Sequence, residues 1–241
     1  MKIALCAARF VNGDMPGNIE RMISYMRKYG TEADVICFGE AFLQGFDGLI
    51  WDYDADVHIA VAQDAPEIAR LRHAARDEGV VLAFGYMELA GEKIYSSYMV
   101  IAADGAVLCN YRRMSVGWKA PGVDERYAEG DSCVVFEYGG KKFSVMLCGD
   151  LWTDDVAAKL KDIDADVVLW PVYTDFDAEV WNTTEKLEYA ARANEYYRLA
   201  LLVNCVCDGD GRAKGGAAVF ENGCIASEVP AGGENVLVVE V

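Results

Sequence analysis

The stretch SVMLCGDLW, residues 144–152, is a short apolar run that stops at Cys148 and is followed at once by Gly149 and Asp150. A run of this length that ends in turn residues is typical of a buried strand. A second run of the same kind, ADVICFGE (residues 33–40), ends at Glu40. Open α/β sheets bind their ligands at the carboxyl ends of strands, so both stretches put a reactive side chain where a site is expected.

Strand and helix patterns alternate along the rest of the chain. The residue spacing predicts strands at 2–8, 80–89, 165–171, 200–205 and 234–241, and helices at 18–30, 64–79, 153–162 and 181–199. Turn residues predict hairpins that reverse at 104–105, at 139–140 and within 215–228. No linker, short repeat or low-complexity tract interrupts this order. We therefore expect a single domain over residues 1–241, with a mixed sheet system and helices outside it.

Composition narrows the class of protein. Hydrophobic residues make up 53% of the 241 residues, so a sizeable core is expected. The formal net charge of −17 would repel nucleic acid phosphates. No apolar run approaches the roughly 20 residues of a membrane span, and the N-terminal MKIALCAARF lacks the pattern of a signal peptide, so we expect a cytosolic protein.

Eight cysteines are too sparse in a chain of this length for a disulfide scaffold, and most lie in strand-like runs as small apolar residues. Cys205 and Cys207 form a spaced pair, but no second pair completes a zinc site. A cysteine redox protein is a weaker hypothesis because the chain has no Cys-x-x-Cys. The sequence thus calls for no metal or cofactor.

If Cys148 is a nucleophile, another group must accept its proton. The only two histidines, His58 and His73, stand in settings that do not suggest catalysis. Glu40 is flanked by Phe38 and Phe42 and can act as a desolvated base. A cation nearby would favour the thiolate and stabilise an oxyanion. Taken singly, each residue also has an ordinary interpretation, as a solvated strand-end glutamate and a buried strand cysteine.

The order of three segments carries more information than any one of them. VICFGEAFLQGF (residues 35–46), NYRRMSVGWKAPGVDERYAEG (110–130) and VMLCGDLW (145–152) together resemble the nitrilase superfamily of carbon–nitrogen hydrolases. The resemblance covers essentially the whole chain. It implies a four-layer αββα sandwich, pairing of subunits through their helices, and hydrolysis of an amide, less often a nitrile, through a thioester on the cysteine of a Glu-Lys-Cys triad. In this chain the resemblance implies Glu40 as the base and Cys148 as the nucleophile.

The chain departs from this pattern at the lysine. Counted from Tyr111, the family's lysine falls on Arg113, and a planar, permanently charged arginine cannot shuttle protons. Lys119, six residues later, is the alternative cation, and we favour it because the oxyanion calls for a compact ammonium donor. The resemblance also implies Glu125 as an accessory glutamate. The backbone N–H of Gly149 is the expected second oxyanion donor.

The leading hypothesis is therefore an amidohydrolase that acts on the non-peptide carbon–nitrogen bond of a small-molecule amide, as a homodimer or higher homo-oligomer. The alternative is a catalytically silent small-molecule binding protein on the same fold, since lysine is lost at position 113. Arg192 and Glu195 are predicted to have a structural role in ion pairing. The identity of the substrate is not predicted, because specificity lies in loops.

Overall fold

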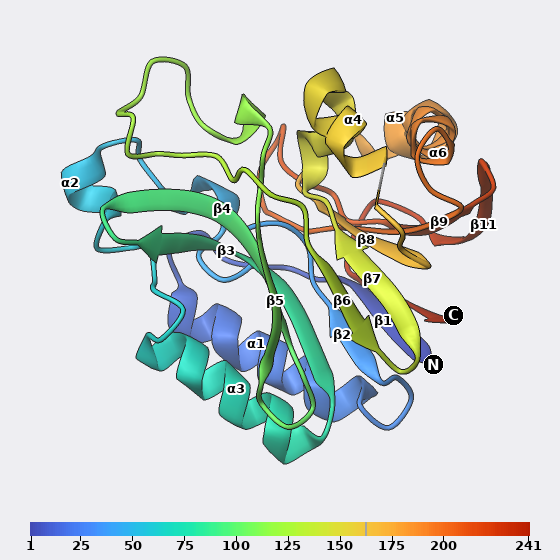
Figure 1. The fold of residues 1–241 in the computed structure, drawn as a ribbon, viewed down its shortest axis with the longest axis horizontal. Helices are drawn as coiled ribbons and strands as arrows, with labels where there is room; N and C mark the ends of the chain where they lie inside the picture. Colours follow the sequence, from blue (N-terminus) through green and yellow to red (C-terminus); the bar gives the residue numbers. More distant parts are fainter. Residues whose placement is uncertain (162) are drawn as a thin grey trace.

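A computed structural model of the chain describes residues 1–161 and 163–241. Over these residues the strands form two six-stranded sheets (Figure 1). The first sheet has the order β12-β1-β2-β3-β4-β5. Its strands are β1 (Lys2–Ala7), β2 (Val35–Cys37), β3 (Val81–Ala90), β4 (Lys93–Ile101), β5 (Val107–Arg112) and β12 (Asn235–Glu240). β1, β2 and β3 run parallel, whereas β4, β5 and β12 pair antiparallel to their neighbours.

The second sheet repeats this plan with the order β11-β10-β9-β8-β7-β6. Its strands are β6 (Val135–Tyr138), β7 (Lys141–Val145), β8 (Val167–Val172), β9 (Leu199–Asn204), β10 (Ala217–Glu221) and β11 (Cys224–Val229). β7, β8 and β9 are parallel, so their carboxyl ends lie along one edge of this sheet.

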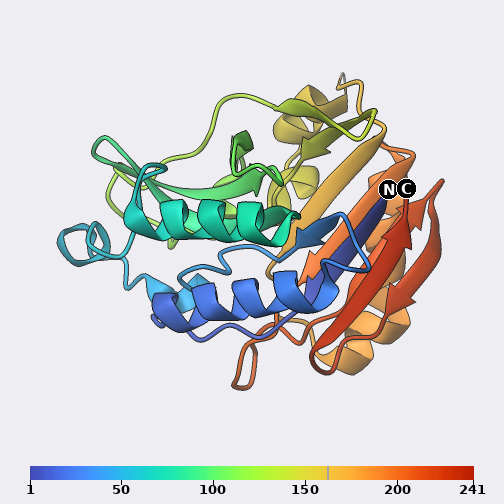
Figure 2. The same cartoon turned by 90° about the horizontal axis from the view of Figure 1, so that it is seen from below.

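Helices cover the outer face of each sheet. The α-helices are α1 (Met15–Tyr29), α2 (Tyr53–Asp56), α3 (Pro66–Glu78), α4 (Asp154–Lys161), α5 (Ala178–Val180) and α6 (Lys186–Asn194). α1 and α3 run side by side over the first sheet (Figure 2), and α4, α5 and α6 lie over the second (Figure 1). Short 3₁₀ turns occur at Phe46–Gly48, Val116–Trp118 and Cys148–Trp152. The predicted four-layer αββα sandwich is confirmed.

Successive side chains of each strand point to opposite faces of its sheet, and this alternation produces two apolar layers. Leu5 and Val81 of the first sheet pack with Val145 and Leu169 of the second, so these side chains fill the space between the sheets. The residues in between, such as Leu82, point the other way and pack with α1 and α3. The central strands of each sheet are therefore buried on both faces or nearly so, which explains the unbroken apolar runs in the sequence.

All four predicted helices have different bounds in the structure: the helix predicted at 18–30 is observed as Met15–Tyr29, and the one at 64–79 as Pro66–Glu78. The helix predicted at 181–199 begins as a π-helical turn at Trp181–Glu185, continues as α6 and ends at Asn194, and α5 lies directly before it. β9 then begins at Leu199, where β-pairing replaces the helical pattern. The helix predicted at 153–162 is observed as Asp154–Lys161, and its last predicted residue lies outside the described residues. None of the described helices is long and apolar enough to cross a membrane.

Candidate active site

Glu40 lies just beyond the carboxyl end of β2 and is fully buried. Its Oε1 atom accepts a hydrogen bond from Nη1 of Arg113 at 2.9 Å and another from the hydroxyl of Ser96 at 3.1 Å. Its Oε2 atom has no hydrogen-bond partner among the described residues. A buried carboxylate oxygen without a partner is costly, so this atom is the free end of the group and is available to a proton.

Arg113 follows the last residue of β5 and is 4% exposed. Its Nε atom donates a hydrogen bond to the hydroxyl of Ser115 at 2.8 Å. Burial opposes the charge of this guanidinium, but the carboxylate of Glu40 outweighs it and the pKa of Arg113 is raised. Nη2 donates no hydrogen bond to any described residue, and a methyl group placed on Gly149 would lie only 2.5 Å from it. One edge of the guanidinium therefore faces the turn that contains Cys148 and Gly149, and its Nη2 donor is unused among the described residues.

Cys148 is the first residue of the 3₁₀ turn after β7 and has a φ of 42°, which is uncommon for a residue other than glycine. Its thiol lies 3.7 Å from the carbonyl oxygen of Tyr173, and its own carbonyl accepts a hydrogen bond from the indole of Trp170 at 3.0 Å. Burial, and then the negative charge of Glu40, raise the pKa of Cys148 to about 12, while the charge of Arg113 lowers it. The thiol is therefore protonated near neutral pH and needs a base to become a nucleophile.

Asp150 joins the turn that begins at Cys148 to the segment that carries Arg113. Its Oδ2 atom accepts hydrogen bonds from the backbone N–H of Leu147 at 2.8 Å and from the hydroxyl of Tyr111 at 2.6 Å. Its Oδ1 atom accepts from the backbone N–H groups of Met114 at 3.2 Å and Ser115 at 2.8 Å. From the sequence alone this residue is a turn carboxylate. Its hydrogen bonds to the segment that follows β5 can be seen only in the tertiary structure.

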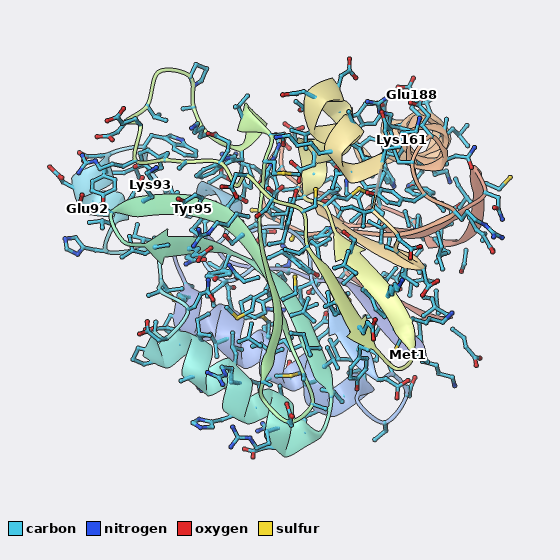
Figure 3. The ribbon with its side chains drawn as sticks, in the orientation of Figure 1. Met1, Glu92, Lys93, Tyr95, Lys161 and Glu188 are labelled. Atoms are coloured by element: carbon cyan, nitrogen blue, oxygen red, sulfur yellow. The ribbon has the colours of Figure 1, made fainter. Side chains whose placement is uncertain are left out.

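Arg112 lies on the opposite face of the first sheet from Arg113, as alternation along a strand requires. Its guanidinium donates two hydrogen bonds to the buried carboxylate of Glu88, at 2.9 and 2.7 Å. It also stacks over the ring of Tyr95, which is labelled in Figure 3, with Cζ 4.2 Å from the ring centre. Burial acts to raise the pKa of Glu88, but the hydrogen bonds from Arg112 and from Ser97 outweigh it and the pKa is lowered. This ion pair fixes the end of β5 from which Arg113 projects.

Lys119, the cation that the sequence analysis favoured, makes its described side-chain contacts within its own loop. Its ammonium donates to the carbonyl oxygen of Tyr127 at 2.5 Å and pairs with Glu129 at 2.7 Å. The adjacent Trp118 is buried against Trp51 and Tyr127, with ring centres 6.0 and 6.4 Å apart, and this packing directs the loop toward them. Arg113 is instead the cation in contact with Glu40.

Glu125 is exposed on the same loop, and no described contact joins it to Glu40, Arg113 or Cys148. Arg192 on α6 pairs at 2.7 Å with Glu195, the residue directly after this helix, and this contact is consistent with a structural role. The described residues hold no group of three or more histidine, cysteine and acidic side chains arranged to bind a metal.

Aromatic and charged side chains contact Tyr173, whose carbonyl oxygen lies 3.7 Å from the thiol of Cys148. The ring of Phe46 stacks on that of Tyr173, with ring centres 4.4 Å apart. The Tyr173 hydroxyl lies 3.3 Å from Asp47, which pairs with Arg212 at 2.8 Å. The partnership of Asp47 with Arg212, 165 residues apart, has no local signal in the sequence.

The family model for carbon–nitrogen hydrolases matches residues 2–241, which is almost the entire chain. The chain belongs to the carbon–nitrogen hydrolase family. The resemblance inferred from three short segments is thereby confirmed, and so is the predicted class of enzyme.

Several known proteins are similar in sequence to this carbon–nitrogen hydrolase. A protein described as a hydrolase in the pqqF 5' region of Pseudomonas protegens is 30% identical over 80% of this chain and 69% of its own length. An (R)-stereoselective amidase of a Pseudomonas species is 24% identical over 87% of this chain and 73% of its own length. A glutamine-dependent NAD(+) synthetase of Xanthomonas campestris is 27% identical over 92% of this chain, which spans only 40% of that longer protein.

Solved structures agree on the fold of this carbon–nitrogen hydrolase. A cysteine-to-serine mutant of the Nesterenkonia AN1 amidase, from the nitrilase superfamily, matches with a TM-score of 0.82 and 20% identity over 100% of this chain and 91% of that one. A glutamine-dependent NAD+ synthetase from Acinetobacter baumannii matches with a TM-score of 0.81 and 23% identity over 98% of this chain and 44% of that one.

Proposed function

We propose that this carbon–nitrogen hydrolase cleaves the amide bond of a small molecule through a thioester on Cys148, with Glu40 as the general base and Arg113 as the cation. The observation that carries this proposal is the contact of Arg113 with Glu40 at 2.9 Å. Both charges act on the thiol of Cys148, because Glu40 raises its pKa and Arg113 lowers it. The proposal replaces Lys119 by Arg113 and leaves Glu125 without a role in the reaction.

The first half of the reaction forms the thioester. Oε2 of Glu40 takes the proton of the Cys148 thiol while Sγ attacks the amide carbon, and the carbonyl oxygen becomes an oxyanion. The backbone N–H of Gly149 and Nη2 of Arg113 are the donors for this oxygen. Glu40 then gives its proton to the leaving nitrogen, the carbon–nitrogen bond breaks, and an amine or ammonia departs.

The second half hydrolyses the thioester. Glu40 takes a proton from a water molecule that attacks the thioester carbon, and the same donors stabilise the second oxyanion. The carbon–sulfur bond breaks, the proton returns to sulfur, and the carboxylic acid leaves. Because the guanidinium of Arg113 stays charged throughout, both proton transfers fall to Glu40. A permanent cation is sufficient for the oxyanion, so the loss of lysine does not favour the silent binding protein.

Amidase relatives support this reaction. The Nesterenkonia amidase has been solved as a glutamate-to-glutamine mutant with the acetamide moiety of fluoroacetamide covalently added at the active site cysteine. The same mutant has also been solved after Michael addition of acrylamide at that cysteine. We infer that Cys148 of this chain takes an adduct in the same way. An amide fits these relatives better than a nitrile.

The test is to trap the adduct. The purified protein is incubated with fluoroacetamide and a panel of small amides, and intact mass and peptide mass spectrometry locate any adduct. We expect modification at Cys148 and none in Cys148→Ala, which should also lose hydrolysis of every amide that the wild type cleaves while keeping its unfolding midpoint. Near-normal turnover by Cys148→Ala would overturn the proposal.

We also infer that two subunits pair through the outer helices. Leu187 is 56% exposed, Trp152 43% and Val180 39%, and all three belong to the helical side of the second sheet. Large apolar side chains exposed on neighbouring elements mark an interface. Analytical ultracentrifugation of the wild type and of Leu187→Glu checks this pairing, and a wild-type monomer at micromolar concentration would contradict it.

All eight cysteines are free thiols. This supports our proposal that the protein works in a reducing compartment, where disulfides are rare.

A further inference from the structure

An arginine in the place of a catalytic lysine raises a problem of orientation. A lysine ammonium is compact and can donate in any direction, whereas a guanidinium is planar and its donors point in fixed directions. Arg113 meets the oxyanion position only if the plane of its head group is set correctly. Its Nη1 atom is used on Glu40 and its Nε atom on Ser115, and together these two contacts leave Nη2 beside Gly149.

Ser115 is itself held in place. The residue is 2% exposed, and its backbone N–H donates to Oδ1 of Asp150 at 2.8 Å. The other carboxylate oxygen of Asp150 accepts from the N–H of Leu147, the residue directly before Cys148. The hydroxyl of Ser115 is thus fixed relative to the nucleophile turn by one shared carboxylate. A hydrogen bond from a guanidinium to an oxygen fixed in this way defines both the position and the plane of the head group.

We propose that Ser115 is the positioning residue for Arg113, and that its hydrogen bond to Nε is the feature that lets an arginine act where the family has a lysine. The proposal rests on the role assigned above to Arg113. The proposal makes a specific prediction, because a lysine side chain has no atom that corresponds to Nε of arginine. The hydroxyl of Ser115 should matter when residue 113 is arginine and should lose its importance when residue 113 is lysine.

A double-mutant cycle of Ser115→Ala and Arg113→Lys tests this prediction. In the wild-type background we expect Ser115→Ala to lower kcat about tenfold or more, since it removes one hydrogen bond to a charged group, with little change in KM. In the Arg113→Lys background the same change should alter kcat by less than about twofold. Ser144→Ala is the matched control, because Ser144 is equally buried and its hydroxyl donates to the carbonyl of Val134 at 2.9 Å, away from the site.

Alkylation of Cys148 by iodoacetamide gives a readout that does not need hydrolysis. The charge of Arg113 lowers the pKa of the thiol. If Ser115 holds that charge in place, Ser115→Ala should move the pH profile of alkylation to higher pH, and this shift should vanish in the Arg113→Lys background. A role in folding alone would move the urea unfolding midpoint and leave the pH profile where it is.

Two results would overturn the proposal. One is that the effects of the two substitutions simply multiply, which would mean that Ser115 does not act through Arg113. The other is that Ser115→Ala leaves both kcat and the alkylation profile unchanged. If the wild type hydrolyses no amide in the panel while the alkylation profiles still show the coupling, the proposed function fails and the role of Ser115 stands.

Discussion

Replacing Gly149 with alanine puts a methyl group into the space that the Arg113 guanidinium occupies. The added carbon would lie 2.5 Å from Nη2 of Arg113 and 3.4 Å from the hydroxyl of Ser115. Alanine keeps the backbone N–H of Gly149, and the φ of this residue is not in the left-handed region, so the backbone accepts the change. The substitution therefore disturbs one of the two proposed oxyanion donors and leaves the other in place.

The distances around Gly149 and Arg113 give the size of the expected loss in kcat. To reach an ordinary contact of 3.4 Å, the guanidinium must retreat by 3.4 − 2.5, or about 0.9 Å. A retreat of that size along the 2.9 Å bond to Glu40 lengthens it to about 3.8 Å, beyond hydrogen-bonding range. Loss of one oxyanion donor typically costs about 10²–10³ in kcat, and a misplacement of about 1 Å costs about 10². We expect Gly149→Ala to lower kcat about 10²-fold.

Steady-state kinetics on an amide that the wild type cleaves provide the assay. Gly117→Ala is the matched control, because its methyl group would lie 3.4 Å from the same Nη2 atom, an ordinary contact. That variant should keep kcat within about twofold. If Gly149→Ala retained full kcat with a normal unfolding midpoint, Arg113 would not be an oxyanion donor. Equal losses in both variants would show that the guanidinium is not specifically crowded at Gly149.

Four further outcomes follow from the same contacts. Arg113→Met should lower kcat at least about 10²-fold, whereas Lys119→Met should keep most of it; the reverse result would restore Lys119 as the cation. Glu40→Gln should slow acylation about 10²–10⁴-fold, measured as the burst of released amine, and an unchanged burst would contradict its role as base. Alkylation of Cys148 should keep accelerating up to about pH 12, and Arg113→Met should move that profile higher because a cation that lowers the pKa is lost. The lowered pKa of Glu88 stabilises the fold above the pKa of an unfolded glutamate and this contribution disappears as pH falls through the folded value, so the urea midpoint should fall with acid in the wild type and fall less in Glu88→Gln.

The layered fold could be predicted because its signals are local. Short apolar strands alternate with amphipathic helices, and residues such as Ile19, Met22 and Met26 recur at helical spacing and are buried against the first sheet. The strand-end positions of Glu40 and Cys148 follow from the same pattern. The helix predicted over 181–199 was too long at its C-terminal end, because α6 ends at Asn194 and the chain pairs as β9 from Leu199.

The choice of cation could not be made from the sequence. Arg113 and Lys119 are six residues apart on one connecting segment, and no local pattern says which of them turns inward. Pairing of β5 with β4 sets the direction of Arg113, and burial of Trp118 among aromatic rings takes Lys119 to Glu129. Local spacing thus determined the layers and the two strand-end groups. Which cation contacts Glu40 was decided only by tertiary packing, because the direction of a side chain beyond a strand end depends on contacts with residues far away in the chain.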